Sequence, residues 1–168
     1  MEVKKIYFDM DGVLADFDRG IRELCGVEPI DQDVAGDSDR IIIWGNASKI
    51  PHYYDRLELI PGAKEMFDTV YNAYGDRCEI LTGIPKPDKG MKEASEDKIA
   101  WVRRLLSDKV VIHTIYREQK LDYCTGEDCI LIDDLKRNIE PWEERGGTGI
   151  LHTDAESTLR KLRELGIL

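Results

Sequence analysis

The chain has 168 residues, of which 42% are hydrophobic and 35% charged, and this length suits one domain with its own core. Its formal net charge of −10 argues against a broad nucleic-acid-binding surface, because clustered Lys and Arg side chains hold phosphate backbones. No apolar run is long enough to cross a bilayer, and charged residues lead directly into the first expected strand where a signal peptide would stand. We therefore expect a cytoplasmic protein without nucleic-acid or membrane partners. The four cysteines include no CxxC pair, which speaks against a zinc site or a disulfide framework, and Cys124 is the thiol we expect to be exposed.

The first expected strand, residues 3–8, ends in two carboxylates one residue apart, Asp9 and Asp11. Residues i and i+2 of an extended chain lie on the same side. Both carboxylates are therefore expected to converge beyond the carboxyl end of the strand, where open parallel sheets bind their ligands. Gly12 then allows a sharp turn. Taken alone, this pattern fits an Asp-rich turn equally well, so its meaning depends on the rest of the chain.

A helix is expected at residues 17–25, after which residues 18–60 as a whole break the regular pattern with acidic turns and aromatic residues. We interpret this segment as a small helical cap, inserted after the first strand, that covers the site and excludes water. Phe17 and Trp44 are the expected substrate wall, although each aromatic side chain of the segment could instead pack within the cap itself. His52 is expected to be a structural or surface residue.

The remainder alternates strands and helices. Apolar strand patterns occur at residues 78–81, 110–114, 129–132 and 148–152, and helical patterns at 63–74, 96–107, 139–145 and 155–165. Strands that are apolar on both faces and are separated by helices predict an α/β fold with a parallel sheet and right-handed crossovers.

Further polar residues follow these strands. Thr82 and Gly83 end the second strand, and the paired acids Asp133 and Asp134 end the fourth. Each pattern has an ordinary structural explanation, since a pair of acids also suits a helix N-terminus. The choice of a phosphate-binding lysine stays open: Lys98 begins a predicted helix, and the alternatives are Lys86, Arg117 and above all Lys120, shortly before the fourth strand.

Together these motifs, in this order, resemble those of the haloacid dehalogenase superfamily, and the resemblance covers nearly the whole chain. It implies a Rossmann-like, three-layer core made of residues 1–17 and 61–168, with residues 18–60 as the cap. It also implies a phosphatase that forms an aspartyl phosphate on Asp9, while Asp11 protonates the leaving group and later deprotonates water.

The same resemblance implies a Mg²⁺ cofactor held by Asp9, Asp133 and the backbone carbonyl of Asp11, with Asp134 binding through water or orienting the ligands. Thr82, Gly83 and Lys98 are then expected to bind the phosphate oxygens, and Lys120 is a possible further substrate contact.

A narrower resemblance concerns the substrate. The run DMDGVLADF, with residues 59–63, 98–102 and 118–120, is similar to the 5'(3')-deoxyribonucleotidase family, which implies a nucleoside monophosphate as substrate. That family usually has a hydroxyl residue after the threonine, where this chain has Gly83. The alternatives are a small sugar- or metabolite-phosphate phosphatase and a phospholigand-binding module without turnover, and a homodimer is possible in each case.

Overall fold

The computed structural model describes residues 1–168 and contains one five-stranded sheet in the order β3-β2-β1-β4-β5. Every neighbouring pair of strands is parallel. The strands are β1 (Lys5–Phe8), β2 (Cys78–Gly83), β3 (Val111–Ile115), β4 (Cys129–Asp133) and β5 (Thr148–Leu151). The α/β fold with a parallel sheet is therefore confirmed, and all five predicted strands are present.

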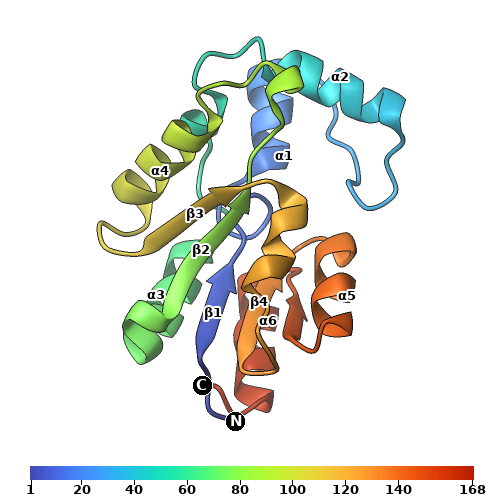
Figure 1. Ribbon diagram of the computed structural model, residues 1–168. Helices are drawn as coiled ribbons and strands as arrows, with labels where there is room; N and C mark the ends of the chain where they lie inside the picture. Colours follow the sequence, from blue (N-terminus) through green and yellow to red (C-terminus); the bar gives the residue numbers. More distant parts are fainter.

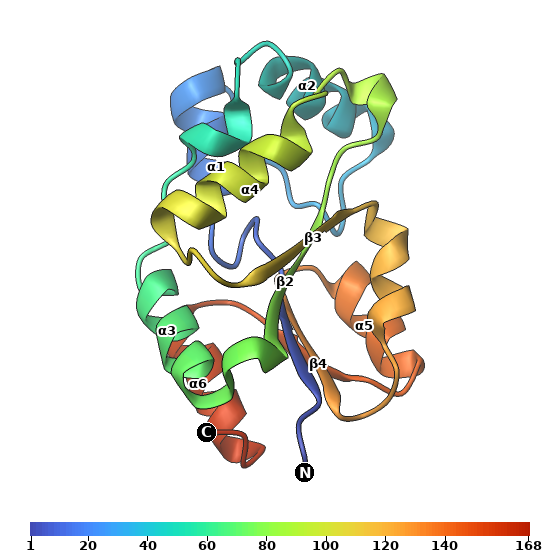
Figure 2. The same ribbon diagram turned by 60° about the vertical axis from the view of Figure 1, so that its left-hand side comes forward.

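Helices connect the strands and cover both faces of the sheet (Figures 1 and 2). They are α1 (Phe17–Gly20), α2 (Asp37–Ala47), α3 (Ala63–Tyr74), α4 (Ala94–Leu105), α5 (Lys136–Glu144) and α6 (Ala155–Glu164). A π-helix, η1 (Ile21–Cys25), continues α1, and short 3₁₀ helices include η2 (Tyr53–Arg56) and η5 (Arg117–Tyr123). No helix has the length and apolar character that spanning a membrane requires.

Alternate residues of β1 pack into different layers, as expected for a strand that is buried on both faces. Ile6 and Phe8 belong to a large apolar cluster with Phe67 of α3 and Leu162 of α6. Tyr7 points to the other face, where it packs with Trp142 of α5. The sheet thus forms the middle of three layers, with α3 and α6 on one face and α5 with η5 on the other (Figure 2).

Most predicted helix ends lie within two residues of the observed ones, but α5 begins three residues earlier than its pattern predicts. The reason lies far away in the chain: the Asp33 carboxylate accepts hydrogen bonds from the backbone N–H groups of Lys136 (3.0 Å) and Arg137 (3.1 Å). This satisfies free donors of the first turn. A second expectation was wrong: Cys124 is buried, because its side chain packs against Trp142 of the neighbouring helix.

Residues of the expected cap lie beyond the carboxyl ends of the strands, while both chain termini lie at the opposite end of the sheet (Figure 1). Helix α1 and η1 rise from β1, α2 crosses above them, and η2 packs against α4. Tyr53 is buried there and donates a hydrogen bond to the carbonyl of Phe17 (3.0 Å). Trp101 of α4 is fully buried, as expected for a core residue, and donates to the carbonyl of Leu57 (2.8 Å).

Candidate active site

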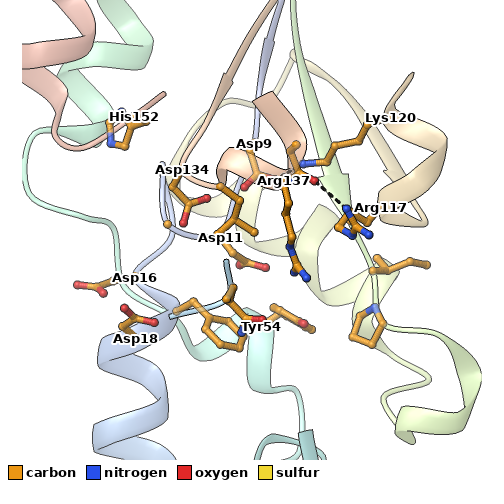
Figure 3. Close-up of a pocket in the computed structure, with 18 of the residues that line it drawn as sticks. Asp9, Asp11, Asp16, Asp18, Tyr54, Arg117, Lys120, Asp134, Arg137 and His152 are labelled. Atoms are coloured by element: carbon orange, nitrogen blue, oxygen red, sulfur yellow. Dashed lines mark hydrogen bonds and ion pairs between the residues drawn. The ribbon is translucent and has the colours of Figure 1, made fainter. Parts of the chain in front are cut away.

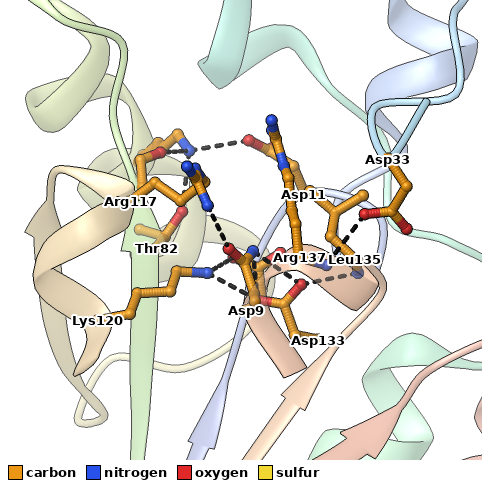
Figure 4. Close-up of polar contacts among 12 residues, drawn as sticks. Asp9, Asp11, Asp33, Thr82, Arg117, Lys120, Asp133, Leu135 and Arg137 are labelled. Carbon is orange, nitrogen blue, oxygen red and sulfur yellow. Dashed lines mark hydrogen bonds and ion pairs between the residues drawn. The ribbon is translucent and has the colours of Figure 1, made fainter. Parts of the chain in front are cut away.

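The candidate site lies where β1, β2 and β4 end side by side. Phe8 pairs with Ile80 on one side and with Ile132 on the other, so that the residues that follow these positions emerge at the same edge of the sheet. The side chains of Asp9, Thr82 and Asp133 accordingly lie close together, although up to 124 sequence positions separate them (Figure 4). This edge is where open α/β sheets bind ligands.

Lys120 joins the first and fourth motifs. Its Nζ lies 2.8 Å from Asp9 Oδ1 and 2.8 Å from Asp133 Oδ2, and all three side chains are buried (Figure 4). Asn138 of α5 donates to both oxygens of Asp133, at 3.2 and 3.0 Å. Burial alone would lower the pKa of Lys120, but the carboxylates of Asp133 and Asp9 raise it above its usual value. Lys120 therefore stays charged and partly neutralises the two acids.

Lys98 serves the other carboxylate. Its Nζ, which is fully buried, lies 2.9 Å from Asp11 Oδ2 and donates to Thr82 Oγ1 (2.8 Å) and the carbonyl of Gly83 (2.7 Å). The same ammonium stands 4.4 Å from the ring centroid of Tyr54. Asp9 and Asp11 are thus held by different lysines, and both lysines that the sequence left as alternatives belong to the site.

A cluster of three carboxylates provides a place for a metal ion. Asp9, Asp133 and Asp134 each offer an oxygen, and these oxygens lie within 4.8 Å of one another. Burial and the charge of Asp133 raise the pKa of Asp9 to about 7, while burial and the charges of Asp9 and Asp133 raise the pKa of Asp134 to about 9.

Two observations show that these residues fit a hard cation. Asp134 Oδ1 is buried without a hydrogen-bond partner. All the atoms that could bind a metal ion here are oxygens, which Mg²⁺ prefers as ligands. Gly12 leaves the room that Asp134 occupies: a Cβ at position 12 would stand 2.1 Å from Asp134 Oδ2. The cluster places the Asp134 carboxylate directly beside the other two. The side chain of Asp11 turns to Lys98 instead.

A cavity of about 410 Å³ opens above these groups (Figure 3). Asp9, Asp11, Gly83 and Lys120 line it on the side of the sheet, and Phe17, Trp44 and Tyr54 line it on the side of the expected cap. Phe17 and Trp44 form an edge-to-face pair with centroids 5.8 Å apart. The two residues expected as a substrate wall therefore do face the site, whereas Tyr53 lies behind them.

Several residues of the cavity have no counterpart among the predicted ones. Arg137, Asn138 and His152 line it from α5 and from the loop after β5, and Asp16 and Asp18 line it at the start of α1. Arg137 and Asn138 could have been found from the sequence, because they lie in the first turn after Asp133 and Asp134. That turn must lie at the same sheet edge. His52 lies elsewhere, with Nδ1 2.8 Å from Asp97 Oδ1, as expected for a structural residue. Lys86 also lies elsewhere, paired with Glu118 at the surface.

Comparison with known proteins shows the fold. No family model matches the chain, and no curated protein matches it. Among solved structures, a haloacid dehalogenase (HAD) superfamily hydrolase from Ehrlichia chaffeensis superposes with a TM-score of 0.53 at 16% identity, over 98% of both chains. A dehalogenase with an intermediate complex gives 0.53 at 12% identity, over 88% of this chain and 84% of that one. An L-2-haloacid dehalogenase from Xanthobacter autotrophicus with covalently bound chloropropionic acid gives 0.51 at 11%, over 99% and 84%. The chain therefore has the Rossmann-like α/β fold of HAD-type hydrolases.

Proposed function

We propose that the chain is a Mg²⁺-dependent phosphomonoester hydrolase that transfers the phosphoryl group to Asp9. The observation that carries this proposal is the separation of Asp9 and Asp11, which line one cavity but have different cationic partners. A two-step hydrolysis needs such a division, because one carboxylate must act as nucleophile while the other moves protons.

In the first step an Asp9 carboxylate oxygen attacks phosphorus, the bond between phosphorus and the ester oxygen breaks, and Asp11 gives its proton to the leaving alkoxide. In the second step Asp11 takes a proton from water as the water oxygen attacks phosphorus, which releases inorganic phosphate and restores Asp9. Lys98, with its contacts to Asp11 and Thr82, holds the acid beside the phosphate subsite. The phosphate oxygens accept hydrogen bonds from the Thr82 hydroxyl and the backbone N–H of Gly83.

Asp9, Asp133 and Asp134 would hold the Mg²⁺ ion, with the backbone carbonyl of Asp11 as the further ligand that the family resemblance implies. When bound, the cation shields the phosphate from the carboxylates and polarises it. Lys120 keeps Asp9 and Asp133 in place between turnovers, since it bridges them from the side of η5.

The dehalogenases among the structural neighbours make carbon–halogen cleavage the competing reaction. The position of Asp11 favours a phosphoester over a haloacid as the substrate. A halide leaves without a proton, whereas an alkoxide requires one, and the carboxylic acid form of Asp11, which lines the cavity, would supply it.

For the substrate we propose a nucleoside monophosphate. Phe17, Trp44 and Tyr54 offer an aromatic wall opposite Asp9, which suits a nucleobase or a deoxyribose. In this proposal residues 18–60 act as a cap that contacts the part of the substrate beyond its phosphate. A sugar phosphate or another metabolite phosphate would undergo the same chemistry, but a group other than a nucleobase would then contact these aromatic side chains.

The test is phosphate release from nucleoside monophosphates, sugar phosphates and an aryl phosphate, with 2-chloropropionate assayed for halide release. We expect Mg²⁺-dependent release that EDTA stops and that Asp9→Asn lowers by several orders of magnitude, strongest on nucleotides. Release from sugar phosphates alone would keep the chemistry and refute the nucleotide assignment. Halide release, or no release from any substrate, would refute the phosphatase itself.

A further inference from the structure

Two arginines, Arg117 and Arg137, line one side of the cavity, a third, Arg40, lies near Arg137, and none of the three has an ion-pair partner. Arg117 comes from η5, Arg137 from α5 and Arg40 from α2, so that they meet from both sides of the site. Arg117 has only a long contact to Asn138 Oδ1 (3.5 Å), and Arg40 donates to the carbonyl of Gln32 (3.1 Å). The Nε atoms of Arg137 and Arg40 are buried without any hydrogen-bond partner.

This arrangement is costly in the free protein. A buried donor without a partner loses its hydration and gains nothing in return. Burial and the charges of Arg117 and Arg40 lower the pKa of Arg137, and the charges of Asp33 and Asp133 oppose this shift less strongly. Yet the chain carries an excess of ten acidic residues that could have paired with them. An anion that enters the cavity would satisfy the arginines.

The phosphate group that is hydrolysed does not explain why arginines line this side of the cavity. Its surroundings already contain two buried cations, Lys120 beside Asp9 and Lys98 beside Asp11 and Thr82. The guanidinium of Arg137 lies farther toward the cap, between the Asp9–Lys120 end of the cavity and Tyr54 (Figure 3). Its strongest charge neighbours are the two other arginines rather than Asp133.

We propose that the substrate carries a second anionic group, a phosphate or a carboxylate, which Arg137 and Arg117 bind on the cap side of the cavity. The inference rests on the proposed phosphatase function and replaces the nucleoside monophosphate by a substrate with a second anionic group, either a nucleoside bisphosphate or a phosphorylated carboxylate. A guanidinium matches both anions, because its planar fork can donate two parallel hydrogen bonds to a pair of oxygens. The volume of about 410 Å³ lies in the range of small-molecule sites, so one bisanionic metabolite fits.

The experiment compares matched substrate pairs that differ in the second anion alone. Glycerol 3-phosphate against 3-phosphoglycerate tests a carboxylate, and thymidine 5'-monophosphate against thymidine 3',5'-bisphosphate tests a phosphate. We expect kcat/KM to be about tenfold to a hundredfold higher for the bisanionic member of one pair, as charge-assisted hydrogen bonds imply. Which pair shows the preference identifies the anion.

The variant Arg137→Gln should abolish this preference, because kcat/KM falls more for the member with two anionic groups than for its partner with one. Its thermal unfolding midpoint should be unchanged or higher, because the substitution removes a half-buried cation whose Nε has no hydrogen-bond partner. Arg163→Gln, at an exposed position of α6, is the matched control and should leave the preference intact.

An equal loss on both members of each pair would show that Arg137 serves the reacting phosphate, and would overturn the inference. So would the absence of any preference in the unmodified enzyme. If no phosphate is released from any substrate, the proposed function fails first. Calorimetric titration of the Mg²⁺-loaded Asp9→Asn variant then tests the inference alone: 3-phosphoglycerate or the bisphosphate must bind more tightly than its partner, and Arg137→Gln must remove the difference.

Discussion

At the scale of single residues, the site depends on two lysines that are buried for different reasons. Lys120 balances two carboxylates that would otherwise face each other unscreened, and Lys98 orders Asp11 next to Thr82. Asp9 thereby shares one buried cation with Asp133, while Asp11 remains free on one oxygen, Oδ1, which has no partner. This difference between Asp9 and Asp11 comes only from their positions, because both are aspartates at the end of the same strand.

The variant Lys120→Met tests this balance through stability. Loss of a buried cation leaves Asp9 and Asp133 without their partner, so we expect the free energy of unfolding in EDTA to fall by about 3–5 kcal/mol. Added Mg²⁺ should restore part of this loss, since a bound cation neutralises the same carboxylates. Lys86→Met, which removes an exposed pair with Glu118, should leave the free energy of unfolding almost unchanged. A loss that Mg²⁺ leaves untouched would contradict a shared metal and lysine site.

The variant Asp11→Asn tests the acid role through the leaving group. A weakly basic aryl leaving group needs little protonation, whereas an alkoxide needs a full proton transfer. We expect Asp11→Asn to lower kcat by about 10²–10⁴-fold on an alkyl phosphate and much less on 4-nitrophenyl phosphate. Measurement of kcat across phosphate esters of graded leaving-group basicity checks this. Equal losses on all esters would argue that Asp11 does not act as the acid.

At the scale of elements, polar contacts tie the segment above the sheet to α4 and α5. Asp33 caps the N-terminus of α5, and His52 contacts Asp97 of α4 (2.8 Å) and Glu93 just before it (3.2 Å). The first contact also orients the turn that carries Arg137. The geometry of the cavity therefore depends on how this segment docks onto α4 and α5.

Removal of the Asp33 cap should loosen this docking. We expect Asp33→Ala to cost about 0.5–2 kcal/mol in the free energy of unfolding, the usual range for a capping carboxylate, and to raise KM more than it lowers kcat. Asp39→Ala, an exposed acid of the same segment, serves as control. Chemical denaturation with steady-state kinetics checks both parts, and equal effects of the two substitutions would contradict a specific cap.

The contact of His52 should depend on pH. A hydrogen bond to Asp97 and the charges of Asp97 and Glu93 raise the pKa of His52 above its ordinary value. Its contribution to stability is therefore fully present below about pH 6.5 and is lost as pH rises through the raised pKa. We expect His52→Asn to lower the unfolding midpoint at pH 6 and to have less effect at pH 9. Asparagine is chosen because it tolerates the left-handed backbone conformation of this position (φ +53°). An equal change at both pH values would refute the charge contact.

The sequence predicted well what local patterning determines. Asp9, Thr82 and Asp133 could be placed together because each ends an apolar strand, and parallel strands end at one edge. The Asp33 cap was not predicted, since 104 positions separate Asp33 from the Arg137 N–H and no periodicity joins them. The choice between Lys98 and Lys120 likewise required the folded positions of α4 and η5.

At the scale of the whole molecule, the sheet acts as a rigid base that brings together residues from three strand ends, and the segment between β1 and α3 covers the resulting cavity (Figures 1 and 3). The core on both faces of the sheet holds these strand ends in register. We propose that this arrangement makes Asp9 the phosphoryl acceptor.

The most direct measurement is a single-turnover reaction of the Mg²⁺-loaded enzyme with a hydrolysable phosphomonoester, quenched in acid, reduced with borohydride and mapped by peptide mass spectrometry. An acyl phosphate on Asp9 is reduced to homoserine, so we predict homoserine at position 9 and an unchanged aspartate at position 11. Phosphate release with unmodified aspartate at position 9 at every quench time during the turnover would contradict this mechanism, because water would then attack the phosphate directly.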